Sequence, residues 1–580
     1  MVGQRYDQGA EALGTHPAAP TPRPDVVLIT IDDAGFNDVG YQNPSAYSAT
    51  PNIDRYSSQG VRLSQYYGQP SCSPSRAALM TGVWVHRLGF QDSEVSAYSN
   101  FSTPLRYATI AERLKKLGYA TVGWGKWNIG HCAEAMLPWN RGFDYFLGYF
   151  TAAIDYRTRA TGRNYTHGGV DRPLYDQLEG WASTGEWRKP EDVFDETYDS
   201  LLYAKKAAAA ISTADGPLFA WLAFHGVHAD NDDSKNITDN EIEPGSRGLA
   251  ELRRGLANAT DGRIKFAEAM YVVDYGVGLV VEAARDANRL GIVIVHSDNG
   301  AMPCTYGGPT ADVPGSNYPL RSGKFQYFEG GVRVPAFVYA PEILPTTGVY
   351  RGLMHHVDWL PTIVAGIAGG DVSKTDADDL GIDGVDHWAW IKSVRVEDDS
   401  PLLAAPLDAV GPRDEIVFDI STAAYNLSYG TDSAPKDLRL PYADAIIAYR
   451  YKHLKLLKRH TDDDAYYRPD RGYLPNCTAM FCMMNRELYS TQEARCDFTD
   501  FLFNLTEDPL EQNNLADHPH YRHIRRDLED KAKRHFSRAF YQPLNHISRS
   551  SVDANHAFYK AGDVIVPWGG EPKSGCELVY

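Results

Sequence analysis

Two pairs of oxygen-bearing side chains follow two strongly apolar segments of the 580-residue chain. Asp32 and Asp33 come directly after the first of these segments, and Asp298 and Asn299 come soon after the second. Carboxylate and amide oxygens are the ligands that hard divalent cations prefer. Either pair alone is typical of a turn or a helix cap. Their joint occurrence at the ends of two predicted strands favours a cation site at one edge of a sheet.

A second pattern surrounds Cys72, in a segment of sequence CSPSRAALMTG that ends at Gly82. A lone cysteine ahead of a helix is ordinarily a thiol without a special role. This segment, however, matches C-x-P-S-R-x-x-L-x-T-G at every defining position. The chain thereby resembles the type I sulfatases, in which this cysteine is oxidised to formylglycine, an aldehyde whose hydrate is the nucleophile.

The resemblance covers most of the chain and is closest to the branch of arylsulfatases B, I and J. It implies an α/β fold with an alkaline-phosphatase-like large mixed sheet sandwiched by helices, and a smaller C-terminal α+β domain. Segments 66–67 and 137–149 look most like that branch. Further segments that look like family landmarks are Asp32–Asp33, 118–119, 125–127, 137–144, His228, 298–300, 319–324, 329–333 and 503–509.

The same resemblance implies a ligand set for one Ca²⁺ ion, which would polarise and orient a sulfate ester. These ligands are Asp32, Asp33, Cys72 as formylglycine, Asp298 and Asn299.

The resemblance also implies cationic side chains that bind the sulfate group and stabilise the aldehyde hydrate. Arg76, Lys126 and Lys324 match the family positions for this role, and His228 and Lys324 would protonate or stabilise the departing oxygen. Taken singly, each of these residues would be unremarkable in a chain of this length.

One position departs from the family pattern. The family segment reads Gly-Lys-x-His, and that histidine is held to accept a proton when sulfate is released, but this chain has Asn128 there. An amide can hydrogen-bond but cannot act as a base. Three hypotheses follow: slower turnover, a base supplied by His131 or His225, or a protein that binds sulfated glycans and has lost efficient catalysis.

The leading interpretation is a sulfuric-ester hydrolase acting on a sulfated sugar, such as N-acetylgalactosamine 4-sulfate, or on an aryl sulfate. The formylglycine-generating enzyme would be its partner during maturation. The enzyme alternative is a phosphoesterase or phosphonate hydrolase of the same superfamily. Those enzymes commonly use Ser or Thr and two metal ions, so the single oxygen-rich set favours sulfate.

Alternating strands and helices must position these residues, because polar clusters past the ends of parallel strands meet at one edge of an α/β sheet. We expect a flexible leader over residues 1–24, a catalytic domain over 25–400 and a C-terminal α+β subdomain over 401–580. The expected strands are 25–31, 119–123, 217–224, 291–295, 334–339, 415–420, 445–457 and 498–505, and the expected helices are 105–117, 264–290, 357–368 and 519–540.

Composition narrows the function classes. A net charge of −18 argues against nucleic acid and anionic lipid as general partners, and no run of about 18 apolar residues could span a membrane. The first 24 residues lack the apolar core of a signal peptide. Seven N-x-Ser/Thr sequons nevertheless favour the secretory pathway, with an extracellular or lysosomal destination.

The seven cysteines leave an even set of six if Cys72 becomes an aldehyde. Six cysteines allow 15 pairings, among which Cys477 with Cys482 and Cys496 with Cys576 are candidates.

Overall fold

The protein is described by a computed structural model. The described residues are 23–43, 49–91, 94–190, 197–228, 237–243, 245–257, 259–303, 315–373, 381–395, 403, 411–421, 445–461, 498–539, 552–561 and 563–567.

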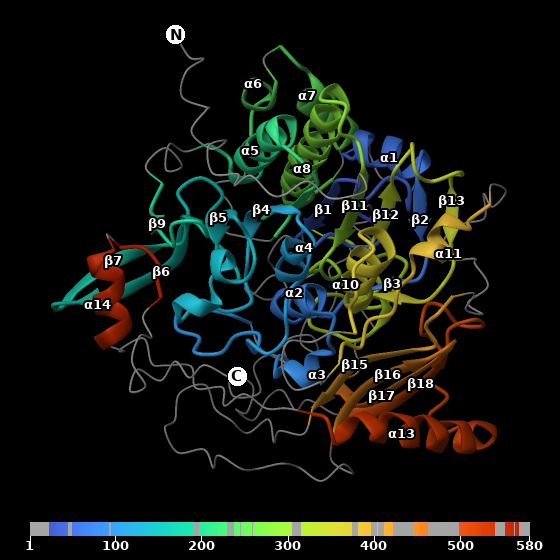
Figure 1. Ribbon diagram of the computed structural model, residues 1–580. Helices are drawn as coiled ribbons and strands as arrows, with labels where there is room; N and C mark the ends of the chain where they lie inside the picture. Colours follow the sequence, from blue (N-terminus) through green and yellow to red (C-terminus); the bar gives the residue numbers. More distant parts are fainter. Residues whose placement is uncertain are drawn as a thin grey trace.

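A mixed ten-stranded sheet forms the centre of the molecule (Figure 1). Its strand order is β13-β2-β12-β11-β1-β10-β4-β5-β8-β9, and the consecutive strands from β11 to β5 pair in parallel. The strands are β1 Val26–Ile31, β2 Val61–Leu63, β4 Ala120–Lys126, β5 Tyr145–Tyr149, β8 Leu178–Trp181, β9 Trp187–Arg188, β10 Leu218–Ala223, β11 Ile292–Ser297, β12 Ala336–Tyr339 and β13 Gly348–Tyr350.

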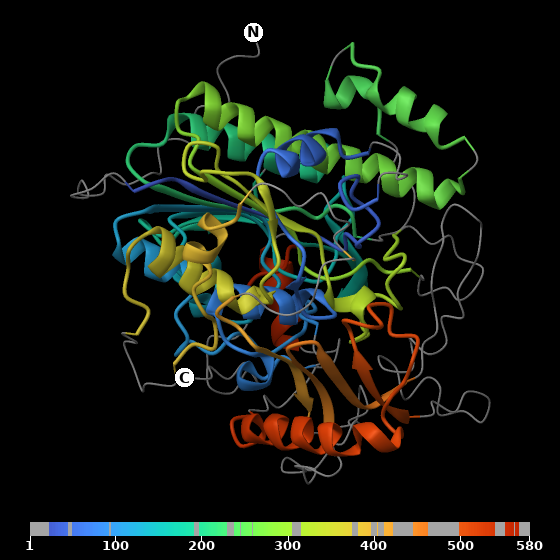
Figure 2. The ribbon, with the colours of Figure 1, turned by 90° about the vertical axis from the view of Figure 1, so that its right-hand side faces the viewer.

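Both faces of the sheet are covered, which explains why β1 is a continuous apolar run without alternation. Val27 and Ile29 pack into the core under one helix layer, whereas Val26 and Leu28 pack into the core on the other side. Figure 2 shows α8 lying over the first face. The first layer contains α1 Pro51–Ser58, α5 Asp199–Thr213 and α8 Asp261–Asp286, and the second contains α2 Cys72–Thr81, α4 Ile110–Lys116, α10 Trp359–Pro361 and the π-helix Thr362–Ile367.

Short elements connect these layers. They are the strand pair β3 Tyr66–Tyr67 and β14 Met354–His355, and the helices α3 Val85–Leu88, α6 Asp239–Ile242, α7 Gly248–Gly255, α9 Glu329–Val332 and α11 Trp388–Lys392.

A separate four-stranded antiparallel sheet lies at the lower edge of Figure 1, with α13 Arg522–Phe536 along one face. Its strands are β15 Glu415–Ser421, β16 Ile446–Tyr451, β17 Leu454–Thr461 and β18 Phe498–Asn504. Its apolar residues join the core under the second helix layer. The large mixed sheet and the smaller α+β unit confirm the predicted fold class.

The expected single strand over 445–457 is wrong, because the chain turns between β16 and β17. Lys452 has a φ of 54°, so the backbone reverses within a two-residue loop. The Lys-His pair in that loop is not one of the usual Gly or Asn turn signals, and the apolar residues on both sides looked continuous.

The C-terminal helix α14 Val552–Lys560 lies beside the hairpin of β6 Ala160–His167 and β7 Val170–Tyr175, away from α13 (Figure 1). Tyr175 N donates to the Asp563 carbonyl at 2.9 Å, and Ile565 N donates to the Tyr175 carbonyl at 2.8 Å. Contacts therefore tie residues 552–567 to the part of the chain that carries the large sheet. The domain boundaries at residues 24 and 400 stay a prediction.

Within the described ranges, no helix has the length and apolarity needed to cross a membrane. Of the described cysteines, Cys72 is a free buried thiol and Cys132 is disulfide-bonded. The predicted pairs Cys477–Cys482 and Cys496–Cys576 lie outside the described residues.

Candidate active site

The carboxyl ends of two neighbouring parallel strands bring three aspartates together. β1 and β11 pair so that Ile31 faces Ser297, and the following residues therefore meet at the sheet edge. Asp33 N donates to Asp298 Oδ1 at 3.1 Å. Oxygens of Asp32, Asp33 and Asp298 and the sulfur of Cys72 all lie within 4.8 Å of one another. The predicted convergence of these side chains is thus observed.

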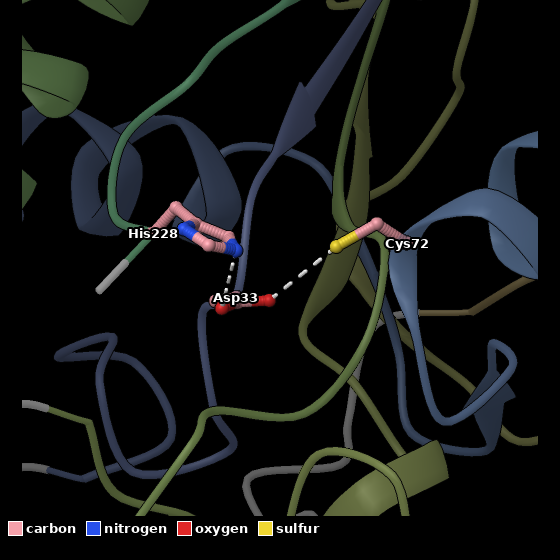
Figure 3. Close-up of side chains that lie close together, drawn as sticks. All are labelled: Asp33, Cys72 and His228. Atoms are coloured by element: carbon pink, nitrogen blue, oxygen red, sulfur yellow. Dashed lines mark hydrogen bonds and ion pairs between the residues drawn. The ribbon is translucent and has the colours of Figure 1, made fainter. Parts of the chain in front are cut away.

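Cys72 begins α2, and its sulfur points toward Asp33 (Figure 3). Its Sγ lies 3.3 Å from Asp32 Oδ1 and 3.8 Å from Asp33 Oδ1. Lys324 Nζ lies 3.2 Å from the same sulfur. Burial raises the pKa of the Cys72 thiol well above its usual value, and the charge of Asp32 adds to this rise. The thiol is therefore protonated at neutral pH and is a poor nucleophile.

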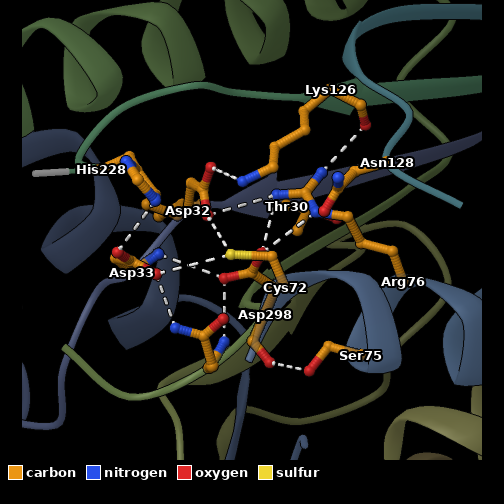
Figure 4. Close-up of polar contacts among 12 residues, drawn as sticks. Thr30, Asp32, Asp33, Cys72, Ser75, Arg76, Lys126, Asn128, His228 and Asp298 are labelled. Atoms are coloured by element: carbon orange, nitrogen blue, oxygen red, sulfur yellow. Dashed lines mark hydrogen bonds and ion pairs between the residues drawn. The ribbon is translucent and has the colours of Figure 1, made fainter. Parts of the chain in front are cut away.

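Each aspartate has a cationic partner, and Figure 4 labels those of Asp32 and Asp298. Lys126 Nζ donates to Asp32 Oδ2 at 2.7 Å. Lys324 Nζ lies 2.7 and 2.8 Å from the two carboxylate oxygens of Asp33. Arg76 reaches Asp298 Oδ2 through Nη2 at 2.7 Å and through Nε at 3.1 Å. Three buried aspartates thus lie against three buried cationic side chains.

Charge pairing lowers the pKa of two of the three aspartates, whereas burial and the charge of Asp298 raise the pKa of Asp32. Burial alone would raise the pKa of Asp298, but the Arg76 guanidinium, with Lys126 and Lys324, holds it below the usual range. Burial likewise opposes ionisation of Asp33, yet Lys324 and His228 lower its pKa. Asp33 and Asp298 are therefore carboxylates at neutral pH, the form that can bind a cation.

The side-chain oxygen of Asn299 is a potential metal ligand that accepts no hydrogen bond from the described residues. Its Nδ2 donates to Asp33 Oδ1 at 2.6 Å, whereas its buried Oδ1 has no hydrogen-bond partner among the described residues. A buried carbonyl oxygen without a partner costs free energy unless a cation or water satisfies it. Together with the three aspartates, this oxygen fits a hard divalent cation.

His228 lies on the outer side of the cluster. Its Nε2 is 3.7 Å from Asp33 Oδ2, and about 10% of its side chain is exposed, compared with 3% or less for Lys324, Lys126 and Arg76. Tyr156 donates a hydrogen bond from its hydroxyl to the His228 carbonyl at 2.9 Å. This imidazole is therefore the group most accessible from solvent among those named here.

Asn128 is held by structural hydrogen bonds. Its Oδ1 accepts from Ser73 Oγ at 2.7 Å, and its Nδ2 donates to the Val95 carbonyl at 3.2 Å. The Ser73 hydroxyl also lies 2.9 Å from a carboxylate oxygen of Glu94. The side chain of Asn128 thus links the start of α2 to the segment that follows α3.

The two alternative bases lie in different surroundings. His131 Nε2 donates to the Ala97 carbonyl at 3.4 Å, and burial lowers the pKa of this imidazole to about 4. His225 pairs through Nδ1 with Asp199 at 2.7 Å, and its ring is 6.1 Å from that of His228. Of the two, only His225 has a contact with a predicted site residue in the described structure.

Sequence reasoning did not single out Ser75, Ser73 or Glu94. Ser75 Oγ donates to the Asp298 carbonyl at 2.7 Å and accepts from Gln69 N, so it fixes α2 against the end of β11. The two serines lie inside the Cys72 motif, so their position in that motif could have identified them as site residues. No sequence pattern identified Glu94, because its proximity to Ser73 depends on how the chain folds back after α3.

A compact set of paired charges around carboxylates that could hold a cation suits the hydrolysis of anionic esters. The sequence model of the sulfatase family matches residues 24–368, and the chain belongs to that family. It is therefore a sulfuric-ester hydrolase of the arylsulfatase type.

Comparisons with individual relatives and with a solved structure support this family assignment. Arylsulfatase J of Mus musculus is 30% identical over 509 residues, covering 86% of this chain and 73% of the relative. N-acetylgalactosamine-6-sulfatase of Sus scrofa is 30% identical over 384 residues, covering 63% of this chain and 66% of the relative. The crystal structure of Ps i-CgsB shares the fold with a TM-score of 0.63 at 22% identity, covering 93% and 97% of the two chains.

Replacing Arg76 tests the charge balance of the site. Arg76→Met leaves Asp298 without its main cation, so we expect a loss of about 3–5 kcal/mol in the free energy of unfolding, measured in urea without divalent cations. The control is Arg254→Met at an exposed pair, which should cost at most about 1 kcal/mol. Equal losses in the two variants would contradict the argument.

Proposed function

We propose that Cys72 is converted to formylglycine and that the protein uses this group, with one Ca²⁺ ion, to hydrolyse sulfate esters of carbohydrates or aryl alcohols. The observation that carries the proposal is the environment of Cys72. Its thiol is buried between the side chains of two aspartates and Lys324, with a raised pKa that disfavours the thiolate. An oxygen nucleophile suits such a site better than sulfur, because hard cations prefer oxygen.

The metal would be held by oxygens of Asp32, Asp33, Asp298 and Asn299. A bound divalent cation would polarise the sulfate and lower the pKa of an oxygen bound to it. Lys324 now contacts both oxygens of Asp33, so a bound cation would compete for these oxygens and direct the ammonium group towards substrate. The unpartnered Asn299 Oδ1 supports this ligand set.

The remaining residues would bind sulfate and move protons. Lys126, Arg76 and Lys324 stabilise negative charge because they are buried and preorganised by their aspartate partners. His228 would protonate the departing oxygen, since its side chain is the most exposed of these site groups.

A sulfated amino sugar is the substrate class we favour, with N-acetylgalactosamine 4-sulfate as one candidate. Support comes from the arylsulfatase B, I and J resemblance of the sequence, and from relatives named arylsulfatase J and N-acetylgalactosamine-6-sulfatase. A protein of this kind would mature in the secretory pathway with the formylglycine-generating enzyme as partner. The disulfide-bonded Cys132 and the sequons agree with that route.

The second candidate is a glycan-binding protein with impaired catalysis. It is favoured by Asn128, whose two hydrogen bonds give it a structural role and which cannot accept a proton as histidine can. A phosphoesterase is less consistent with the site. The two clusters of described side chains that could hold a metal ion share Asp33 and Cys72, so they form one centre rather than two.

The first test is the chemistry of residue 72. In protein expressed in its native setting, we expect mass spectrometry of the peptide Leu63–Arg76 to show an aldehyde in place of the thiol. The same preparation should hydrolyse a chromogenic aryl sulfate, and Cys72→Ala should abolish this activity. An intact thiol at residue 72 in natively expressed protein would overturn the proposal.

The second test addresses the position of the family histidine. We expect Asn128→His to raise kcat on an aryl sulfate by about tenfold or more, because a positioned base typically contributes about 10²–10⁴-fold. Asn128→Ala is the control, since it removes the hydrogen bonds without adding a base and should not raise kcat. An unchanged kcat in Asn128→His would rule out a missing base as the cause of slow turnover.

The third test concerns the cation. Ca²⁺ at 100 times its dissociation constant should stabilise the protein by about 2.7 kcal/mol, read as a rise in Tm. Asn299→Ala removes a ligand oxygen without changing charge and should weaken the rise, whereas Asn140→Ala, at an exposed asparagine, should not. The same rise in wild type and in Asn299→Ala would contradict this ligand assignment.

A further inference from the structure

Lys324 lies in a backbone segment that is costly to form. The residues on both sides have left-handed conformations, with a φ of 63° at Ser322 and 72° at Phe325. Such conformations are unfavourable for residues other than glycine and persist only where the surroundings impose them. The position of the Lys324 ammonium therefore depends on bonds that hold this segment from outside.

Some of these bonds come from the large sheet and its loops. Lys324 N donates to the Ala301 carbonyl at 3.0 Å, and Phe325 N donates to the Pro70 carbonyl at 2.6 Å. Gly330 N closes the segment on itself by donating to the Arg321 carbonyl at 2.8 Å. The last hydrogen bond closes residues 321–330 into a loop, and Lys324 is one of the residues of that loop.

The two ends of this loop are both bonded to Glu511, which follows β18. Arg321 Nη1 donates to the Glu511 carbonyl at 2.7 Å, and Glu329 N donates to Glu511 Oε2 at 2.6 Å. Glu511 is fully buried and itself has a φ of 58°. One residue from the C-terminal part of the chain thus clamps both ends of the loop that carries Lys324.

Lys455 of β17 completes the clamp. Its Nζ lies 2.9 Å from Glu329 Oε1 and 2.8 Å from Glu511 Oε1, and all three side chains are fully buried. Glu329 also accepts a hydrogen bond from the Tyr67 hydroxyl at 2.8 Å. A buried cation between two carboxylates has a defined position, because displacing it leaves charges unpaired in a medium of low dielectric constant.

Aromatic packing extends the same contact. The Arg321 guanidinium lies 4.2 Å from the ring centroid of Phe328 and 5.5 Å from that of Phe501 in β18. Phe328 and Phe501 pack edge to face at 5.3 Å. The small sheet therefore contacts the Lys324 loop through a charged cluster and an aromatic cluster at once.

We propose that Glu511 and Lys455 are positioning residues that hold Lys324 at the active site, so that the small C-terminal sheet is a functional part of the sulfatase. Neither residue touches the reacting group. Both act on the loop whose single inward lysine contacts Asp33 and Cys72. The activity measurements below rest on the proposed function, whereas the exchange measurements do not.

Glu511→Gln is the informative change. Glutamine keeps the size, the backbone carbonyl for Arg321 and an oxygen for Glu329 N, but it loses the ion pair with Lys455. Asp500→Asn is the matched control, because Asp500 lies in β18 and pairs with Arg525 of α13 without contacting the Lys324 loop. Both changes replace one carboxyl group by an amide, one within β18 and the other shortly after it.

The first experiment is amide hydrogen exchange on the full-length protein. In Glu511→Gln we expect at least about tenfold faster exchange in residues 318–333 while β15 to β18 stay protected, because loss of the clamp allows local opening. In Asp500→Asn we expect residues 318–333 to exchange as in wild type. Unchanged exchange of residues 318–333 in Glu511→Gln would overturn the proposal, as would equal loss of protection throughout the small sheet.

The second experiment is a double-mutant cycle on kcat for an aryl sulfate. Glu511→Gln should lower kcat by about tenfold or more in wild type, since small misplacements of a positioned group have effects of this size. In the Lys324→Ala background the same change should lower kcat by less than about twofold, because the two residues then act through one interaction. Equal losses in both backgrounds would assign Glu511 a purely structural role.

The failures of the two proposals can be told apart. A wild-type protein with formylglycine but no activity on sulfate esters would refute the proposed function, and the exchange experiment would still decide the role of Glu511. Glu511→Asp gives a further check, because aspartate keeps the charge but is too short to bond both Glu329 N and Lys455. We expect Glu511→Asp to resemble Glu511→Gln in exchange and in kcat.

Discussion

The structure of the active site depends on the pairing of three buried carboxylates with three buried cations. Burying a single unpaired charge would cost several kcal/mol, so neither set is tolerable alone at the edge of this sheet. Asp33, the centre of the arrangement, contacts Lys324, Asn299 and His228 within 3.7 Å. The pairing also fixes the geometry, because each lysine bonds one aspartate, whereas Arg76 Nη2 lies 2.7 Å from Asp298 and 3.6 Å from Asp32.

The large sheet makes this pairing possible. Parallel strands end at the same edge, so Asp32 and Asp298 meet although 266 positions separate them in sequence. Lys126 arrives from β4, two strands away from β1, and Cys72 from the first turn of α2. Because both faces of the sheet are packed with helices, these strand ends cannot shift without disturbing two hydrophobic cores.

Much of this arrangement could be predicted from sequence, and the reasons differ between residues. The apolar segment before Asp32 predicted β1, because a strand buried on both faces has a local pattern. The Cys72 motif predicted the site through resemblance, and the structure brings its residues together with Lys126, Lys324 and Asp298. The metal ligands and catalytic roles of these residues stay predictions. Glu94 and Glu511 could not be predicted, since their surroundings arise only when distant segments pack. The turn at Lys452 was missed for a local reason, because its Lys-His loop has none of the usual Gly or Asn turn signals.

The surroundings of Glu511 show that a segment can be recognised in the sequence although its structural role cannot. Residues 503–509 resembled a family landmark, yet nothing local in them indicates the active site, and Glu511 lies just beyond them. Its carboxylate and carbonyl bond the two ends of a loop almost 190 positions earlier in the chain. A small sheet that merely completed the fold would need only apolar contacts with the large domain. The buried Lys455 between two glutamates is costly to desolvate, and it is better explained by the need for one defined position of the Lys324 loop than by stability alone.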